Sequence, residues 1–446
     1  MTFNPHTHQD RAEMMQTIGI TEFDQLVGAI PESVRYPNLD LPRLLTEMEA
    51  AARLSDLAER NLAPKPGNTY LGAGSYQHFI PATVNQILSR GEFYTAYTPY
   101  QPEVSQGTLQ VIYEFQSMVA ALLGTEIANA SMYDGATALA EGALMAVSAS
   151  KKRNRLVVAG SVHPGYREVL RTYLSSGQIE LIELPVPTTG FANRPEDFAP
   201  YLTDDLAGIV IQYPNFFGAI EDVRAVADAV HAAGANLIVA TYPMPLGLLK
   251  PPGELGADIV AAEGQALGVA QSYGGPYVGL LASRKSFVRQ MPGRLAGQTT
   301  DSEGKRGFVL TLQTREQHIR REKATSNICT NQGLMATAAT VYMASLGPEG
   351  FREAARRCYH NAHYLAQQLA SLPGWELGLD DAFFHEFVVK APEPAKDVNA
   401  KLLTAGIIGG FDLGVVDPTL DQHLLMCATE TNDRAGIDRL ISILAA

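Results

Sequence analysis

The stretch "GIVIQYPNFFGAIEDVRAVADAVHAAGANLIVATYP", residues 208–243, decides the fold. Two short apolar runs, 208–213 and 236–241, predict strands, and the helical spacing of 222–233 predicts a helix between them. Strands that are apolar throughout are buried on both faces, and a helix between two of them makes a parallel crossover. The stretch therefore predicts an α/β protein with a mostly parallel sheet.

The same alternation continues on both sides of this stretch. It predicts further strands over 155–159, 179–184, 258–262 and 276–282, and helices over 105–124, 135–150 and 165–176. Crossovers of this kind are right-handed and place ligands at the carboxyl ends of the parallel strands. That edge of the sheet is the predicted location of a site.

The chain of 446 residues is too long for one ordinary core, so we predict three parts. The first part, residues 1–104, is predicted to be a helical N-terminal arm followed by an irregular loop rich in Gly, Pro and Tyr. One helix of the arm is predicted over 41–60, with Pro42 in its first turn. Residues 105–330 predict the large α/β domain, which ends in a polar stretch from 284. Residues 331–446 predict linking helices (331–346, 348–371) and a small α+β domain (strands 385–390 and 424–428, helices 395–405 and 433–444).

The composition excludes several classes of protein. The net charge of −13 argues against a nucleic-acid partner, because no basic stripe is present. No apolar run reaches the roughly 18 residues that span a bilayer, and the N-terminal residues do not resemble a secretory signal. Cys329, Cys358 and Cys427 are scattered, which predicts neither a disulfide framework nor a metal site. We expect a cytoplasmic protein.

Two candidate site segments follow predicted strands. In "ASMYDGATALAEGALMA", residues 130–146, Asp134, Gly135, Ala136 and Thr137 open a helix with small residues. Such a helix start can bind a phosphate, although Asp134 can equally be an ordinary N-cap. In "SVHPGYREVLRTY", residues 161–173, His163 can stack on a flat ring or exchange a proton, or it can be structural.

Two further candidates lie in loops. "GEFYTAYTPYQPEVSQG", residues 91–107, gathers four aromatic rings, two prolines and Glu103, which suits either a partner interface or a rigid loop packed on its own domain. "REKATSNICTNQGL", residues 321–334, carries Thr325, Ser326 and Asn327 just before a predicted helix. Their hydroxyl and amide groups can contact a phosphate or cap that helix.

This order of features resembles the fold-type-I enzymes that use pyridoxal phosphate (PLP). Such enzymes need a lysine for the Schiff base and a carboxylate that holds the pyridinium nitrogen. The resemblance places the carboxylate at the end of strand 236–241, where the chain has Ala240 and Thr241. It places the lysine just after strand 258–262, where the chain has Glu263, Gln265 and Ala266. We therefore expect no covalently bound PLP in this chain.

Several long segments make the resemblance more specific. They include "YTAYTPYQPEVSQGTLQ", "MYDGATALAEGALMA", "QSYGGPYVGLLA" and "GPEGFREAARRCYHNAHYLAQQL". Together they resemble the P-protein of the glycine cleavage system, glycine dehydrogenase (decarboxylating), in its N-terminal half, which in many organisms is a separate alpha subunit (subunit 1). The resemblance implies that a beta subunit (subunit 2) carries PLP, and that the complex decarboxylates glycine and transfers the aminomethyl group to the lipoyl arm of the H-protein.

The resemblance also implies roles for the candidate residues. The aromatic loop would face the beta subunit, Thr325, Ser326 and Asn327 would reach its cofactor phosphate, and Asp134, Gly135, Ala136, Thr137 and His163 would be vestigial. The loop residues concerned are Tyr97, Thr98, Tyr100, Gln101 and Glu103. Arg284, Lys285, Arg289 and Arg294 would contact an acidic H-protein or a carboxylate, or are ordinary surface charge.

Two other functions remain open on the sequence. One is an independent PLP enzyme whose lysine is Lys250 or Lys285, although both stand in the wrong place relative to the Gly-Gly-Pro corner at 274–276. The other is a catalytically inert scaffold that stabilises the beta subunit.

Overall fold

A seven-stranded mixed sheet is the centre of the structure, a computed structural model that describes residues 5–150, 152–187, 190–378 and 382–446. The strand order is β1-β7-β6-β5-β4-β2-β3, and β7 alone in this sheet runs antiparallel to its neighbours. The strands are β1 (Ile127–Ala128), β2 (Arg155–Val158), β3 (Glu180–Glu183), β4 (Leu206–Tyr213), β5 (Asn236–Thr241), β6 (Ile259–Glu263) and β7 (Gly279–Ser283). The predicted α/β fold with a mostly parallel sheet is confirmed.

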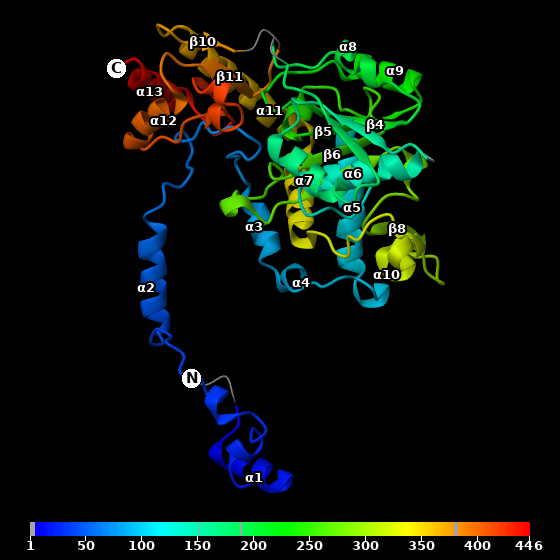
Figure 1. Cartoon of the computed structure of the whole chain (residues 1–446), viewed down its shortest axis with the longest axis vertical. Helices are drawn as coiled ribbons and strands as arrows, with labels where there is room; N and C mark the ends of the chain where they lie inside the picture. The colour runs from blue at the N-terminus through cyan, green and yellow to red at the C-terminus, as the bar shows by residue number, and fades with distance from the viewer. Residues whose placement is uncertain (1–4, 151, 188–189, 379–381) are drawn as a thin grey trace. The chain divides into compact units, whose positions relative to one another are not determined.

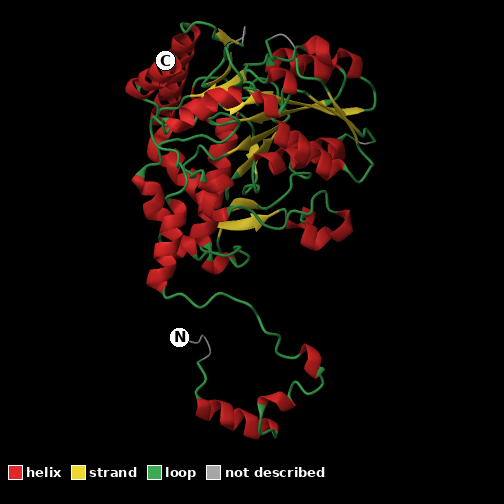
Figure 2. Ribbon diagram, turned by 60° about the vertical axis from the view of Figure 1, so that its left-hand side comes forward, coloured by secondary structure: helices red, strands yellow, loops and turns green. Residues whose placement is uncertain are grey.

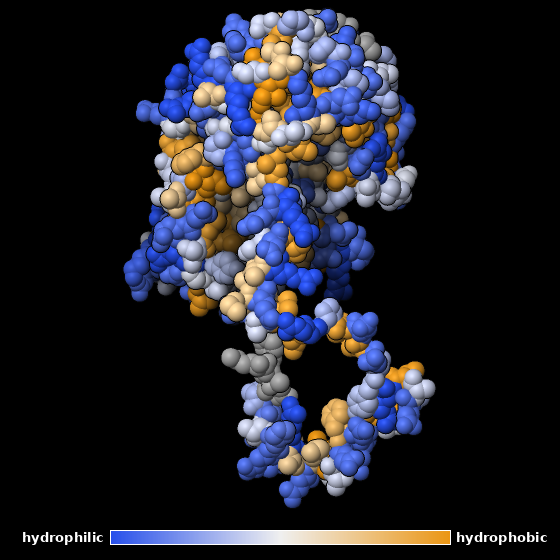
Figure 3. Space-filling model, turned by 90° about the vertical axis from the view of Figure 1, so that its left-hand side faces the viewer, coloured by the Kyte–Doolittle hydropathy of each residue, from blue (hydrophilic) through white to orange (hydrophobic). Residues whose placement is uncertain are grey.

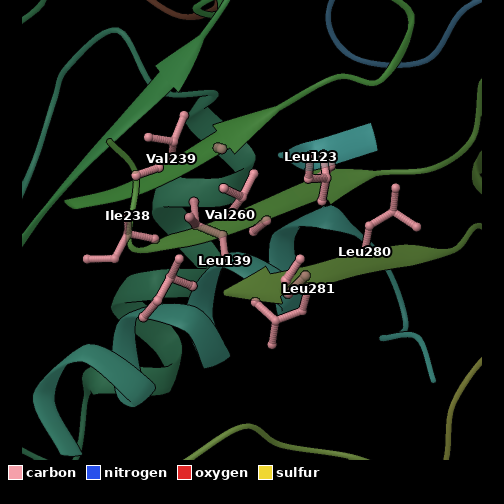
Figure 4. Close-up of a cluster of buried hydrophobic side chains, with 14 of the residues drawn as sticks. Leu123, Leu139, Ile238, Val239, Val260, Leu280 and Leu281 are labelled. Carbon is pink, nitrogen blue, oxygen red and sulfur yellow. The ribbon is translucent and has the colours of Figure 1, made fainter. Parts of the chain in front are cut away.

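Helices cover this sheet (Figures 1 and 2), and β4, β5 and β6 are almost entirely buried. α6 lies against β5, β6 and β7, and α9 lies against β4 and β5. Leu139 of α6 belongs to a buried cluster with Ile238, Val260 and Leu281 of these strands (Figure 4). The helices of this region are α5 (Gln106–Leu123), α6 (Gly135–Ala149), α7 (Pro164–Leu174), α8 (Pro195–Phe198) and α9 (Val223–Ala232).

A smaller antiparallel sheet with its own core forms the C-terminal part, as predicted. Its strand order is β10-β11-β13-β12, and Phe387, Leu424 and Trp375 are buried in its core. The elements are β10 (Glu376–Leu377), β11 (Glu386–Lys390), β12 (Phe411–Asp412), β13 (His423–Cys427), α12 (Ala395–Thr404) and α13 (Arg434–Leu444). The two predicted linking helices are both present within α11 (Gly333–Ala370), and they are separated at Gly347, whose backbone is not helical (φ 61°), just before Pro348.

The polar stretch after residue 284, for which the sequence predicted no helix or strand, has regular structure. It contains a hairpin of β8 (Leu295–Thr300) and β9 (Arg306–Thr311), and then the short α10 (Gln317–Arg320). Only the first half of β8 is buried, and its outer half is the polar "QTT". The apolar signal of a strand is therefore weak there.

The N-terminal residues Met1–Leu62 form a compact unit separate from Ala63–Ala446. It contains α1 (His8–Ile18) and α2 (Glu47–Ala58). The predicted helix start at Pro42 is wrong, because Thr46 caps α2 in a capping box with Glu49. None of the described residues of this unit is buried, and apolar side chains stand exposed among hydrophilic ones (Figure 3).

The second unit begins at Ala63 with a segment that leads to α5. This segment contains α3 (Ala82–Leu88) and α4 (Gly91–Tyr94). The finer division of this unit at residues 104 and 330 stays a prediction. Within the described ranges, no helix has the length and apolarity needed to cross a membrane.

Leu139→Ala should lower the free energy of unfolding by about 2–5 kcal/mol, because the fully buried side chain leaves a cavity between α6 and the sheet. Urea denaturation measures the effect. Leu403→Ala on α12, where the side chain is 59% exposed, is the matched control and should change stability by less than about 0.5 kcal/mol. Equal losses in the two variants would contradict the assigned core.

Candidate functional site

The carboxyl edge of the parallel strands brings the predicted candidates together. Thr241 ends β5 and Glu263 ends β6, and both are buried. α6 begins beside them at Gly135, and His163 is the N-cap of α7 after β2. This is the edge where α/β folds bind their ligands.

The start of α6 is a fully formed N-cap. The Asp134 side chain accepts a hydrogen bond from the Thr137 N–H at 2.8 Å, and the Thr137 hydroxyl accepts one from the Asp134 N–H at 3.2 Å. Gly135 is buried, and Ala136 and Thr137 are half-buried. The structure thus shows the capping role of Asp134, one of the two interpretations that the sequence left open.

Glu263 meets the same helix start from the end of β6. Its Oε2 accepts the Gly135 N–H at 2.9 Å, and its Oε1 accepts the Gln265 N–H at 3.1 Å. Burial, with a smaller contribution from the nearby Asp134 charge, raises the pKa of Glu263 from 4.5 to about 8. A carboxyl group of the chain therefore occupies the N–H donor that a bound anion would use.

Gln265, near the expected lysine position, is fully hydrogen-bonded within the chain. Its Oε1 accepts the Tyr76 N–H at 3.1 Å, and its Nε2 donates to the carbonyl oxygens of Tyr76 at 3.0 Å and Val269 at 2.9 Å. Gln265 is a structural clamp on the segment that contains Tyr76. Tyr76 is buried, and sequence reasoning did not single it out.

His163 is held as a neutral ring with a defined tautomer. Its Nδ1 accepts the Gly165 N–H at 3.0 Å, so the proton is on Nε2, which lies 3.1 Å from the Ala73 carbonyl oxygen and donates to it. Burial lowers the pKa of His163 below 6.5. Tyr166 and Phe216 pack on the ring at centroid distances of 4.9 and 5.0 Å. With both nitrogens engaged, His163 is not arranged for proton exchange.

The segment 72–78 also lies at this edge. The Tyr76 hydroxyl donates to Glu386 Oε2 at 2.7 Å, and the Ala73 N–H donates to Glu386 Oε1 at 2.6 Å, which ties the segment to β11. A cavity of about 20 Å³ beside Tyr76, Tyr242 and His385 has room for one or two water molecules.

A buried contact between His78 and Glu430 anchors the same segment farther along. His78 Nδ1 lies 2.7 Å from Glu430 Oε2, and the other ring nitrogen contacts the Tyr242 hydroxyl at 2.5 Å. Burial acts to raise the pKa of Glu430, but the charge and hydrogen bond of His78 outweigh it and lower the pKa to about 2. Sequence reasoning missed this pair, because the two residues are 352 positions apart.

These residues do not fit a bound PLP. No lysine lies between Gly256 and Arg284, a range that includes β6 and the turn after it. At the end of β5 the chain has Thr241 in place of a carboxylate, and the Thr241 hydroxyl donates to the Tyr213 carbonyl oxygen at 2.5 Å. The Gly135 N–H at the start of α6 is bonded to Glu263. The lysine and the carboxylate that hold PLP in enzymes of this kind are therefore absent from this edge of the sheet.

The aromatic loop 91–107 lies on the surface. Tyr97 is 88% exposed and Tyr100 is 53% exposed; Gln101 and Glu103 are exposed, and Thr98 is half-buried. The Tyr97 ring therefore does not pack on its own domain, which favours the interface over the self-packed loop. Tyr100 is held in place by Arg294, whose Nη2 donates to its hydroxyl at 3.0 Å and whose guanidinium lies 5.4 Å from the ring centroid.

Thr325, Ser326 and Asn327 lie in a different loop, before α11. Ser326 donates its hydroxyl to Oε1 of the buried Glu141 on α6 at 2.7 Å, and the Ile328 N–H donates to the Ser326 hydroxyl at 3.0 Å. Thr325 is half-buried and Asn327 is exposed. Ser326 thus anchors this loop to α6, and α11 begins only at Gly333, too far along to be capped by the three residues.

The four candidate cations differ in their surroundings. Arg284 pairs with Asp258 at 2.8 Å, and Arg294 is buried beneath Tyr100, so the interpretation of Arg294 as surface charge is wrong. Lys285 and Arg289 are exposed.

The two lysines considered for an independent PLP enzyme do not lie at the end of β6. The register of β7 against β6 pairs Gly279 with Glu263 and Ser283 with Ile259. Lys285, which follows β7, therefore lies at the opposite end of these strands from Gln265. Lys285 is therefore not placed to serve this site, and Lys250 is exposed in the turn before β6.

The fold defines the class of the protein. Sphingosine-1-phosphate lyase of Burkholderia pseudomallei has a similar structure, with a TM-score of 0.66 over 93% of this chain and 94% of that one, at 17% identity. The chain thus has the fold of PLP-dependent enzymes.

The sequence then defines the family. The glycine cleavage system P-protein family matches residues 1–444, and the chain belongs to this family. It is 57% identical over 444 residues to a probable glycine dehydrogenase (decarboxylating) subunit 1 of Thermomicrobium roseum, covering 100% of this chain and 99% of that one. A crystal structure of glycine decarboxylase (P-protein) in inhibitor-bound form matches with a TM-score of 0.91 and 42% identity, over 100% of this chain and 99% of that one.

Glu263→Gln should flatten the dependence of stability on pH. Because the pKa of Glu263 is raised to about 8, its contribution to stability is complete below about pH 4.5 and is lost as the pH rises through about 8. Thermal melting between pH 5 and 9 should therefore show a smaller fall in Tm for Glu263→Gln than for the wild type. Glu303→Gln, at a side chain 69% exposed, is the control and should keep the wild-type slope.

Proposed function

We propose that this chain is the alpha subunit (subunit 1) of a glycine dehydrogenase (decarboxylating) and carries no PLP itself. With a beta subunit that carries the cofactor, it decarboxylates glycine and passes the aminomethyl group to the lipoyl arm of the H-protein, in the cytoplasm. The observation that carries the proposal is the filled site of a chain that aligns over its whole length with relatives named subunit 1.

The chain's own contribution is proposed to be a surface that completes the partner's site. The exposed rings of the aromatic loop support this, because a Tyr offers a large apolar area and a hydroxyl at a small cost in side-chain entropy. Arg294 fixes Tyr100, so part of this surface is ordered before the partner binds. We propose that Tyr97, Thr98, Tyr100, Gln101 and Glu103 face the beta subunit, and that Thr325 and Asn327 extend toward its cofactor phosphate from a loop anchored by Ser326. Two of each chain are expected in the complex.

The alternatives are a scaffold that adds no group to the partner's site and an enzyme active by itself. Neither Lys250 nor Lys285 supports the second, since Lys285 lies at the far edge of the sheet and Lys250 is exposed away from the end of β6. The scaffold differs from the proposal in one respect: its loop residues would affect assembly but not turnover within the assembled complex.

Glycine decarboxylation should occur only when both subunits are present. The measurement is release of carbon dioxide from carboxyl-labelled glycine, with lipoylated H-protein present, by the alpha chain alone, the beta chain alone and the mixture. The alpha chain alone should be inactive because no lysine follows directly on β6 and because Glu263 occupies the Gly135 N–H that a phosphate would use. Turnover by the alpha chain alone, or full turnover by the beta chain alone, would contradict the proposal.

Replacement of both Tyr97 and Tyr100 by Ala should weaken binding to the beta subunit by about tenfold or more, because buried interface tyrosines commonly contribute at least about 1–2 kcal/mol. Sedimentation measures how tightly the two subunits assemble. Activity measured while the alpha chain is titrated into the beta chain gives the turnover rate at saturating alpha chain, so that weaker assembly and slower turnover are distinguished. Val415→Ala, where the side chain is 77% exposed outside this loop, is the control. Loss of assembly alone would support the scaffold, and unchanged assembly and turnover would contradict any role of the loop.

A further inference from the structure

The end of β6 and the start of α6 form one closed contact in this chain. Glu263 Oε2 accepts the Gly135 N–H at 2.9 Å, and a Cβ atom at Gly135 would lie 2.9 Å from the Glu263 Cβ and 2.5 Å from the Tyr166 hydroxyl. Glu263 thus takes the N–H of the first residue of α6, and Glu263 and Tyr166 leave no space beside that residue. Glu263 is 5% exposed, so solvent scarcely reaches its carboxyl group.

We infer that Glu263 is the specificity-determining residue that excludes a phosphate group from the start of α6, and thereby decides which subunit carries the phosphorylated cofactor. The inference rests on the proposed function, in that it explains why the alpha chain stays free of cofactor. Glu263 acts by occupying the N–H donor and the volume that a phosphate needs, while Tyr166 narrows the same space.

The missing lysine alone does not account for this exclusion. A phosphorylated ligand can be held through its phosphate without a covalent bond, because the backbone N–H groups and the dipole of a helix start attract anions. A chain that lost only the lysine would keep this second point of attachment. Here the carboxyl group of Glu263 removes it.

Asp134 also disfavours a phosphate at the start of α6, so the test includes a substitution of this residue. Its carboxylate takes the Thr137 N–H at 2.8 Å, so two N–H groups of the first turn serve carboxyl groups of the chain. A phosphate entering beside Asp134 would meet like charge. Asp134→Ser removes this charge while a hydroxyl remains to cap the helix.

The test measures phosphate binding to the purified full-length alpha chain without its partner. The probes are inorganic phosphate, followed by phosphorus NMR line width, and PLP, followed by ligand fluorescence. The variants are Glu263→Ser, Glu263→Gln and Glu263→Ser with Asp134→Ser. We expect no saturable binding to the wild type or to Glu263→Gln, which keeps the volume of the side chain. We expect saturable binding of both probes to Glu263→Ser, and binding about tenfold tighter or more when Asp134→Ser is added.

Circular dichroism and cooperative melting establish which variants are folded. A folded double variant that binds phosphate no better than the wild type would overturn the inference. Tyr166→Phe gives a second measurement that leaves Glu263 in place: it removes only the hydroxyl at the start of α6 and should not admit phosphate. Phosphate binding to Tyr166→Phe would assign the exclusion to Tyr166 and overturn the role of Glu263, even if every Glu263 variant unfolded.

The same preparations separate failure of this inference from failure of the proposed function. PLP binding to the wild-type alpha chain, or decarboxylation by it alone, would contradict the proposed function. If the wild type binds no PLP, the mixture with the beta subunit is active, and the folded Glu263 variants still bind no phosphate, only the inference about Glu263 fails.

Discussion

The hydrogen bonds around the turn after β6 hold the rest of the site together. Glu263 joins this turn to the start of α6, and Gln265 joins it to Tyr76, which in turn bonds to Glu386 on the small sheet. One turn thereby connects the central sheet, α6 and the C-terminal sheet. A buried polar group without a hydrogen-bond partner destabilises the folded state. A substitution at any one of these positions therefore destabilises the protein by leaving its partners unpaired.

The fold could be predicted from the sequence because its signals are local. Apolar runs such as 236–241 coincide with β5, and their alternation with helical segments such as 222–233 fixes the parallel sheet. The errors have local causes as well. The capping box of Thr46 and Glu49 determines the start of α2 more strongly than Pro42 does, and a half-exposed strand such as β8 lacks a continuous apolar run.

The site was predicted only in part, because its partners are remote in sequence. The absence of a lysine after β6 could be read directly, and it indicated a chain without covalently bound cofactor. What takes the cofactor's place could not be read: Gly135 is 128 positions from Glu263, and Tyr76 is 189 positions from Gln265. Arg294 resembled a surface cation for the same reason, since its hydrogen-bond partner Tyr100 is 194 positions away. The exposure of Tyr97, by contrast, agrees with the interface that the tyrosine-rich composition suggested.

The N-terminal unit has a consequence for the life of the protein in the cell. None of its described residues is buried, so it gains almost no stability from an apolar core of its own. Exposed terminal segments of this kind are preferred sites of proteolytic nicking. Cleavage of this chain by proteases is therefore expected to begin in the N-terminal unit, while the large sheet and its helices stay intact.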